Sequence, residues 1–547
     1  MNMRKKIIAF MLVTGMLTGC SANSSSSGSS AVSTEASTAS VTEEATETEK
    51  TSSSTDTEAV SQLPLISITT KSDAPDVMDF IYEPVAKHVS ESISEWDPTY
   101  EAPPEPYYED CTISLKGSDG SSLMSPAAAK VKVRGNWTTL YKKKPLRIKF
   151  ESKQNLLGLN GGEEFKNWLL LAEYKDGSML RNKAALYASR EILSEDGLYA
   201  ADAELVHVEV NGKYLGVYLL TEMQQAAGGR VDIARPEKDY TGADIGYFLE
   251  FDGYFTNEDQ LHSFPLELAG NAPLTPYDGS GGSGRTIQCL PASPDDNKKE
   301  IGVSIKSDIY SQEQHDTIAA FVNNVYRIMY EAAYNHKAFV FTSDDYRTIA
   351  ETTDITPRQA VENVVNVQSL VDMYIISELT CDADIYWSSF FMDADLSADG
   401  SRKLTFEAPW DFDSSMGNRD RCTDGQGFFA SNIVPSADGD DYEAANPWLL
   451  VLAYEDWYQD MIKDKWTKIY DSGVFDRTFQ LIEDDKTSLE EDFNMNYRLW
   501  NNLICNQEYE DELSEPAKSC FTERSAAEYL LKWLRSRVEF LNSQWHR

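Results

Sequence analysis

The spacing of apolar residues changes once along this chain, and that change most constrains its fold. Between residues 110 and 251, apolar and polar residues alternate over short runs, as at Val131 and Val133, which is typical of half-buried strands. After about residue 312, apolar residues recur at the spacing of amphipathic helices. A strand-rich first half followed by a helix-rich second half predicts an α+β fold with two lobes and a ligand site between them.

The individual elements follow from the same patterns and from the turn residues between them. Strands are expected at residues 111–115, 129–134, 145–150, 167–173, 204–210, 214–221 and 246–251, and helices at 178–193, 312–334, 369–379 and most of 447–545. Asn211-Gly212 separates two of these strands and is the strongest short hairpin signal. A further turn is expected between Phe391 and Leu404, where three aspartates look like solvated turn residues.

The N-terminus predicts export and a lipid anchor. Arg4, Lys5 and Lys6 precede a short apolar run over residues 7–17, which is the pattern of a signal peptide. The run ends in Leu17-Thr18-Gly19-Cys20, which resembles a bacterial lipobox, although an ordinary signal peptide with an incidental cysteine is the alternative. Acylation of Cys20 would hold the protein on the outer, extracytoplasmic face of the cell membrane.

Composition divides the remaining chain and limits its partners. Residues 21–62 consist mainly of Ser, Thr, Ala and Glu, which predicts a disordered tether, and residues 63–547 form the expected folded domain. The 49 basic and 89 acidic residues give a net charge of −40, so nucleic acid is an unfavourable partner. We expect the membrane to be contacted through the lipid anchor alone.

Cysteine usage is compatible with an oxidising compartment. Six of the seven cysteines remain after Cys20, an even number that permits three disulfides. None has the spacing of a zinc site, and Cys505 and Cys520 are close enough in sequence for a disulfide to be suspected.

Three segments carry residues suited to phosphate chemistry. The first is a basic cluster at residues 142–149 with Arg134 upstream, which could bind phosphate oxygens or form a solvated edge strand. The second holds Asp411 and Asp413 just after a strand-like run, which suits a divalent cation but also a capped turn. The third is the acidic run Glu378 to Asp384 at a helix C-terminus, where acidic side chains are unfavourable unless a metal, a proton-transfer role or solvent compensates them.

In their order and spacing these segments resemble the spore-coat protein H (CotH) kinase family, whose members have an atypical protein-kinase-like fold. The resemblance rests on five pieces between residues 110 and 420: Arg134-Gly135-Asn136 with Lys144 to Phe150, Trp168 to Ala172 with Leu180 to Asn182, Val210 to Glu222, Glu378-Leu379, and Pro409 to Asp413. It implies a strand-rich N-lobe at about 110–235 and a helix-rich C-lobe at about 236–547.

The resemblance also implies residue roles. Asp411 is similar to the metal-binding aspartate of kinases, with Asp413 as a second ligand, and Asp384 is similar to the catalytic aspartate. Lys149 is similar to the phosphate-pairing lysine, for which Lys144 is the alternative, and Arg134 belongs to the loop that would cover the phosphates. Glu222 ends the strand that would border adenine.

The implied activity is transfer of a phosphoryl group from ATP, with Mg²⁺ or Mn²⁺, to Ser or Thr of a protein. Two departures from kinases are evident: no GxGxxG precedes the lysine strand, and the position of the second metal-binding asparagine is Ser389. The alternative function is an inactive kinase-like scaffold that binds protein or glycan of a cell surface or spore coat.

Overall fold

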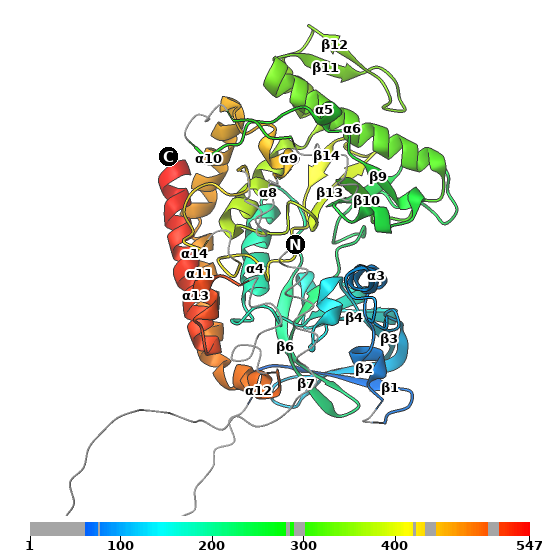
Figure 1. Ribbon diagram of the computed structural model, residues 1–547, viewed down its shortest axis with the longest axis vertical. Coiled ribbons are helices and arrows are strands. Elements are labelled where there is room, and N and C mark those ends of the chain that lie inside the picture. Colours follow the sequence, from blue (N-terminus) through cyan, green and yellow to red (C-terminus); the bar gives the residue numbers. More distant parts are fainter. Residues whose placement is uncertain are drawn as a thin grey trace, which may run out of the picture. The chain divides into compact units, whose positions relative to one another are not determined.

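A closed β-barrel forms the strand-rich part of the computed structural model, which describes residues 61–74, 77–279, 285–288, 301–419, 423–432, 445–500 and 513–547 (Figure 1). Its strand order is β1-β2-β3-β4-β5-β7-β6, and a parallel β1–β6 pair closes it. The strands are β1 (Leu65–Thr70), β2 (Glu109–Lys116), β3 (Ser122–Val133), β4 (Leu146–Gln154), β5 (Phe165–Leu171), β6 (Ala203–Val210) and β7 (Lys213–Glu222).

Period-two alternation fills the barrel interior. Val131, Ile148 and Trp168 are fully buried and belong to one apolar cluster with residues from all seven strands. The predicted hairpin is confirmed: β6 pairs with β7 in antiparallel register across Asn211 and Gly212, whose φ angles are +50° and +74°. Positive φ at both central residues matches the twist of the flanking strands, and Asn and Gly tolerate it.

A second sheet has the strand order β14-β13-β8-β10-β9, and two further strands, β11 and β12, form a separate hairpin. Their bounds are β8 (Gly246–Asp252), β9 (Ser263–Pro265), β10 (Gly302–Ile305), β11 (Ala338–Phe341), β12 (Ile349–Thr352), β13 (Phe390–Asp395) and β14 (Leu404–Phe406). The expected turn between Phe391 and Leu404 is confirmed by antiparallel pairing of β13 with β14. Asp393 is buried, however, because it lies within strand β13 and not in the turn.

Helices dominate the second half of the chain, as the helical spacing predicts. They are α2 (Asp79–Tyr82), α3 (Lys87–Trp96), α4 (Arg181–Ser194), α5 (Leu268–Asn271), α6 (Gln312–Asn335), α7 (Pro357–Val364), α8 (Val367–Thr380), α9 (Pro447–Leu450), α10 (Asp456–Asp471), α11 (Val474–Ser488), α12 (Glu490–Trp500), α13 (Glu515–Lys518) and α14 (Glu523–Trp545). Helix α8 is central, since nearly all of its side chains are buried. Capping boxes at Ser311 and Thr522 begin the long helices α6 and α14.

The largest apolar cluster joins the helices to the barrel. It contains buried residues of α4, α6, α8, α10 and α14 together with Leu169 and Leu171, which lie on the outer side of β5. This outer side of β5 therefore packs against the helical half. The predicted α+β class is therefore confirmed.

Several elements were not predicted, and several predictions concern residues that are not described. Strand β1, helix α3 and the β11–β12 hairpin were not identified from sequence. The signal peptide, Cys20 and most of the tether lie outside the described residues, as do Cys289, Cys422 and Cys505. None of the helices among the described residues is long and apolar enough to cross a membrane.

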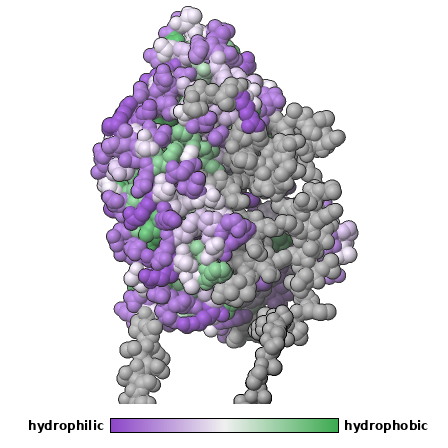
Figure 2. Space-filling model, turned by 60° about the vertical axis from the view of Figure 1, so that its left-hand side comes forward, coloured by the Kyte–Doolittle hydropathy of each residue, from purple (hydrophilic) through white to green (hydrophobic). Residues whose placement is uncertain are grey.

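Most of the protein surface in one view is hydrophilic. Figure 2 shows a face on which hydrophilic residues predominate and hydrophobic residues form small, separate groups. Scattered apolar groups of this kind are normal on soluble proteins. Buried polar residues are therefore the better candidates for a functional site.

Candidate active site

The segment after β14 carries two aspartates through a sharp turn. Asp411 has a φ of +71°, and Phe412 between the two aspartates is buried. The turn is closed by Ser415, whose amide and hydroxyl both donate to the carbonyl of Phe412 at 3.1 and 2.6 Å. A non-glycine residue with positive φ is uncommon and is frequent at functional sites, so this turn holds Asp411 in a strained backbone conformation.

The C-terminus of α8 meets this turn. Cys381 ends the helix in the left-handed conformation (φ 47°), and the amide of Met416 donates to the carbonyl of Thr380 at 2.7 Å. Asp382, which follows the helix, is buried and its Oδ1 accepts the amide of Asp384 at 3.0 Å. The hydrogen bonds thus bring the third predicted segment against the second.

Four carboxylates interact electrostatically at this junction. Burial, followed by the charges of Asp413 and Asp384, raises the pKa of Asp411 to about 8. The pKa values of Asp382 and Asp413 are raised too, chiefly by burial and then, among other groups, by neighbouring aspartates. A group of buried like charges is unfavourable unless a cation is bound or protons are retained.

Two basic side chains face these carboxylates. Burial lowers the pKa of Arg134, whereas Asp411, Glu250 and Asp413 counteract that effect. The Arg134 guanidinium lies 5.9 Å from the ring centroid of Trp410 and forms no hydrogen bond with the described residues. Lys175 is the second cation, since its charge lowers the pKa of both Asp411 and Asp413.

Lys175 lies on the loop between β5 and α4, which is tied to the aspartate turn. The side-chain amide of Asn418 donates to the carbonyl oxygens of Lys175 and Asp413, at 3.1 and 2.7 Å. Arg181, at the start of α4, donates through Nε to the carbonyl of Ser415 at 3.1 Å. These bonds fix the loop beside the carboxylates.

Asn182 and Glu173 complete the inner side of the site. Asn182 Oδ1 accepts the amide of Phe412 at 2.8 Å, and its Nδ2 donates to both carboxylate oxygens of Glu173 at 3.0 and 3.2 Å. Burial, followed by the charges of Asp176 and Asp413, raises the pKa of Glu173 well above its usual value. Glu173 also has a φ of +48°, so Asn182 bonds to one strained residue, Glu173, and to Phe412, which follows the other, Asp411.

The structure brings together some of the predicted site residues. Arg134, Asp384, Asp411 and Asp413 form the interacting cluster. Lys175, Glu173 and Asn182 were not predicted from the sequence. The local sequence feature that could have indicated them is the run of polar residues between strand β5 and helix α4.

The other three predicted residues do not take part in the charge interactions of this cluster. Lys144 Nζ donates to the carbonyls of Tyr82 and Pro84 at 2.6 and 2.7 Å, and so fixes the chain before α3. Glu222 is buried and pairs with Arg230 at 3.1 Å. Lys149 is exposed on β4, and it is opposite Asn167 in the register of β4 and β5.

The suspected disulfide of Cys520 cannot be followed to its partner, because Cys505 lies outside the described residues. The Cys520 thiol donates to the carbonyl of Pro516 at 3.4 Å. Cys520 and Cys111 form no disulfide within the described part of the chain.

A divalent cation fits the aspartate cluster only together with a ligand that supplies further oxygens. No group of three or more His, Cys, Asp or Glu side chains within the described residues could hold a metal ion. Mg²⁺, however, is commonly bound by one or two carboxylates plus substrate phosphates. Asp411 and Asp413 are held by one turn, and both are destabilised by burial and by the charge of Asp384, so they are suited to that role.

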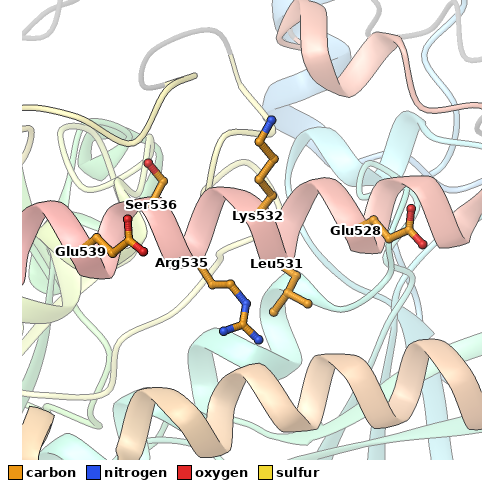
Figure 3. A pocket seen from close by; sticks show the side chains of 6 residues that line it. All are labelled: Glu528, Leu531, Lys532, Arg535, Ser536 and Glu539. Carbon is orange, nitrogen blue, oxygen red and sulfur yellow. The ribbon is translucent and has the colours of Figure 1, made fainter.

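A pocket on the outer side of α14 offers a contrast. Figure 3 shows Lys532 and Ser536 pointing to one side of the helix, and Arg535 and Leu531 to the other. Glu528 and Glu539 complete its lining, so two acidic side chains flank two basic ones along the helix and do not converge on a common point. This pocket contains none of the predicted site residues.

Comparison with known proteins agrees with the sequence motifs. A search of curated proteins finds no match. The profile described as CotH kinase protein matches residues 131–541, which include every residue of the aspartate cluster. The match extends over about three quarters of the sequence, and the chain therefore belongs to the CotH kinase protein family.

Proposed function

We propose that this protein is a CotH-type protein Ser/Thr kinase that transfers a phosphoryl group from ATP with Mg²⁺ or Mn²⁺. In this proposal the β-barrel half acts as the N-lobe and the helix-rich half as the C-lobe of an atypical kinase-like fold. The single observation that carries the proposal is the cluster of Asp382, Asp384, Asp411 and Asp413 facing Arg134 and Lys175.

The residues of this cluster suit the separate tasks of phosphoryl transfer. Asp411 and Asp413 would hold the cation, which neutralises the charge that develops on the phosphate oxygens. Arg134 and Lys175 would bind phosphate oxygens, because their donors lie beside the carboxylates and carry the opposite charge. Catalysis of this type depends on positioning and charge neutralisation.

Asp384 is the residue proposed to orient the acceptor hydroxyl. It lies at the edge of the cluster, and its carbonyl accepts the amides of Trp387 and Ser388 at 2.8 and 2.9 Å, which fixes the following turn. Asp384 would accept the hydroxyl proton while the hydroxyl oxygen attacks the γ-phosphorus and the bond to the leaving ADP breaks. Arg419 Nη1 lies 3.9 Å from Asp384 Oδ1.

The proposed location follows from the N-terminal sequence. Acylation at Cys20 would anchor the enzyme to the membrane of a bacterial cell on its extracytoplasmic side. Its protein substrate would then be a surface or coat protein with exposed Ser or Thr.

A second candidate, an inactive kinase-like scaffold, is favoured by Ser389. Ser389 occupies the position where kinases place a second metal-binding asparagine, and its amide donates to Glu250 Oε1 at 2.8 Å. Its short hydroxyl cannot reach as far as an asparagine amide. A scaffold would retain the cluster as a binding site and lack phosphoryl transfer.

Thermal unfolding with and without ATP and Mn²⁺ separates these functions. Wild-type protein should be stabilised by roughly 2.7 kcal/mol when the ligand is in hundredfold excess over its dissociation constant. Asp411→Ala should abolish that shift, and transfer of labelled phosphate to a protein substrate should then be observed for the wild type alone. Absence of a shift in the wild type would refute the kinase function, and a shift without transfer would favour the scaffold.

A further inference from the structure

Helix α12 has a face on which polar side chains are buried. Asp492, Asn496 and Trp500 recur every four residues along the helix, so they lie on one face. Asp492 and Asn496 are each only 1% exposed. Burial of such polar groups costs free energy unless they are hydrogen-bonded, and it adds little hydrophobic stabilisation. The role of this face therefore depends on the groups that it binds.

The middle and the end of this face bind the backbone of β7. Asn496 Oδ1 accepts the amide of Val217 at 3.2 Å, and Trp500 Nε1 donates to the carbonyl of Leu215 at 2.8 Å. Gly216, between these two residues, has a φ of +104°, and an added Cβ would lie 2.5 Å from Asn496 Oδ1. Glycine allows both the backbone conformation and the close approach, so α12 lies directly against the strand.

The first turn of α12 binds the start of the folded domain. Asp492 Oδ1 accepts the hydroxyl of Ser61 at 2.6 Å, and Asp492 Oδ2 accepts the amide of Gln62 at 3.2 Å. His207 Nε2 lies 2.7 Å from Asp492 Oδ1, and the Tyr214 hydroxyl lies 2.8 Å from His207 Nδ1. Asp492 thus fixes the helix to the β6–β7 hairpin and to the residues that join the domain to the N-terminal segment.

The same helix holds the loop between β5 and α4, which carries Lys175. The Tyr497 hydroxyl donates to the carbonyl of Gly177. The rings of Trp500 and Tyr174 make an edge contact with their centroids 6.3 Å apart. These two contacts lie on either side of Lys175 in the sequence, so α12 fixes the backbone from which this lysine extends.

A lysine that binds phosphate depends on such a fixed backbone. Its side chain has many rotamers, and each degree of freedom that remains in the loop adds to the entropy lost on binding. The Asn418 side chain holds the Lys175 carbonyl from the side of the aspartate turn. The contacts of Tyr497 and Trp500 supply a second support for the same loop, from the helix that also binds β7.

We propose that helix α12 positions Lys175 for phosphate binding. Tyr497 is the positioning residue, and Asp492 holds the helix in place against the β6–β7 hairpin and Ser61. This inference rests on the proposed kinase function. It extends the site to a residue 320 positions further along the chain than the loop residue that it binds.

A double-mutant cycle on the full-length protein tests the inference. Isothermal titration with Mn²⁺-ATP and Mn²⁺-tripolyphosphate would compare the wild type, Tyr497→Phe, Lys175→Ala and the double variant. Hydrogen exchange of the amides of residues 174–180 would report on the loop without any ligand. Tyr454→Phe is the matched control, because the Tyr454 hydroxyl also donates to a backbone carbonyl, that of Pro276, at 2.7 Å.

Tyr497→Phe should weaken both probes about twofold to tenfold, which is the range for the loss of one uncharged hydrogen bond, and should speed exchange at residues 174–180. In the Lys175→Ala background the same substitution should cause no further loss, because the effect of Tyr497 acts through Lys175. Tyr454→Phe should bind both probes as the wild type does. Trp500→Leu, which removes the ring contact with Tyr174, should repeat the pattern if Tyr497→Phe fails to fold.

The inference and the kinase proposal fail in different ways. Equal losses with and without Lys175, or no loss in Tyr497→Phe, would overturn the inference and leave the kinase proposal intact. A wild type that binds neither probe would contradict the kinase proposal. Faster exchange confined to residues 174–180 in Tyr497→Phe would then still support the positioning of the loop by α12, whereas unchanged exchange would overturn the inference as well.

Discussion

Replacing Asp411 by asparagine should make the metal-free protein more stable. The substitution preserves the size of the side chain and removes one carboxylate from the cluster of four. Because Asp411 is buried beside Asp413 and Asp384, its charged form is unfavourable in the folded state. Residues that serve a ligand commonly reduce stability in its absence.

The magnitude follows from the pKa. Burial and the neighbouring carboxylates raise the pKa of Asp411 from 3.8 to about 8, so at pH 7 the folded protein retains a proton that the unfolded chain releases. Linkage then lowers the free energy of unfolding by at most about 4 kcal/mol. Asparagine carries no charge and removes this penalty. Because buried sites behave as though their effective dielectric constant were near 20, we expect Asp411→Asn to raise the free energy of unfolding by only about 2 kcal/mol.

The sign of the pH dependence is set by the raised pKa. The penalty is absent below the unfolded pKa of 3.8, grows as the pH rises, and becomes constant above the folded pKa of about 8. The stability difference between Asp411→Asn and wild type should therefore be larger at pH 8 than at pH 5. Urea unfolding with a chelator, followed by tryptophan fluorescence, measures it at both values.

A clear result would refute this reasoning. If Asp411→Asn is no more stable than wild type at pH 8, or if the difference is the same at pH 5 and pH 8, the aspartate cluster is not strained by its charge. Asp399→Asn is the matched control, because Asp399 is exposed in the β13–β14 turn and its replacement should leave stability unchanged. Mn²⁺-ATP should stabilise wild type and not Asp411→Asn.

Three further predictions concern other buried groups. Glu378→Gln should reduce the free energy of unfolding by about 3 kcal/mol, because Glu378 and Arg537 form a fully buried ion pair at 2.7 Å. Urea titration measures this change, and an unchanged midpoint would contradict it. Burial raises the pKa of Glu407 beside Asp393 to about 7, so wild-type stability should fall between about pH 4.5 and 7, and Glu407→Gln should flatten that part of the profile. Gly417→Ala should lower the thermal midpoint, because Gly417 has a φ of +76° and an added Cβ would lie 2.5 Å from atoms of the α14 side chains; an equal midpoint would disprove it.

Local sequence patterns predicted much of the barrel. Alternation of apolar residues identified six of its strands, and Asn211-Gly212 identified the β6–β7 hairpin. These elements depend on contacts between residues close in sequence, so their signals are local. Strand β1 was missed, since its parallel pairing with β6 joins segments more than a hundred residues apart.

The candidate site was predicted only in part, for a related reason. Asp384, Asp411 and Asp413 stand in recognisable local contexts, at a helix end and after a strand. Lys144 belongs to an equally suggestive basic run, yet its amine is bound by two backbone carbonyls. Which lysine faces the aspartates depends on the direction of each side chain after folding, and the sequence does not contain that information locally.

By itself the sequence determined the α+β class, the order of most elements and the residue types needed for phosphate chemistry, because hydrophobic periodicity and turn residues act over a few positions. Only the tertiary structure decided that Lys175, Glu173 and Asn182 join the aspartates, while Lys144 and Glu222 have structural partners. The physical reason is that burial and charge interactions are set by packing between segments far apart in the chain.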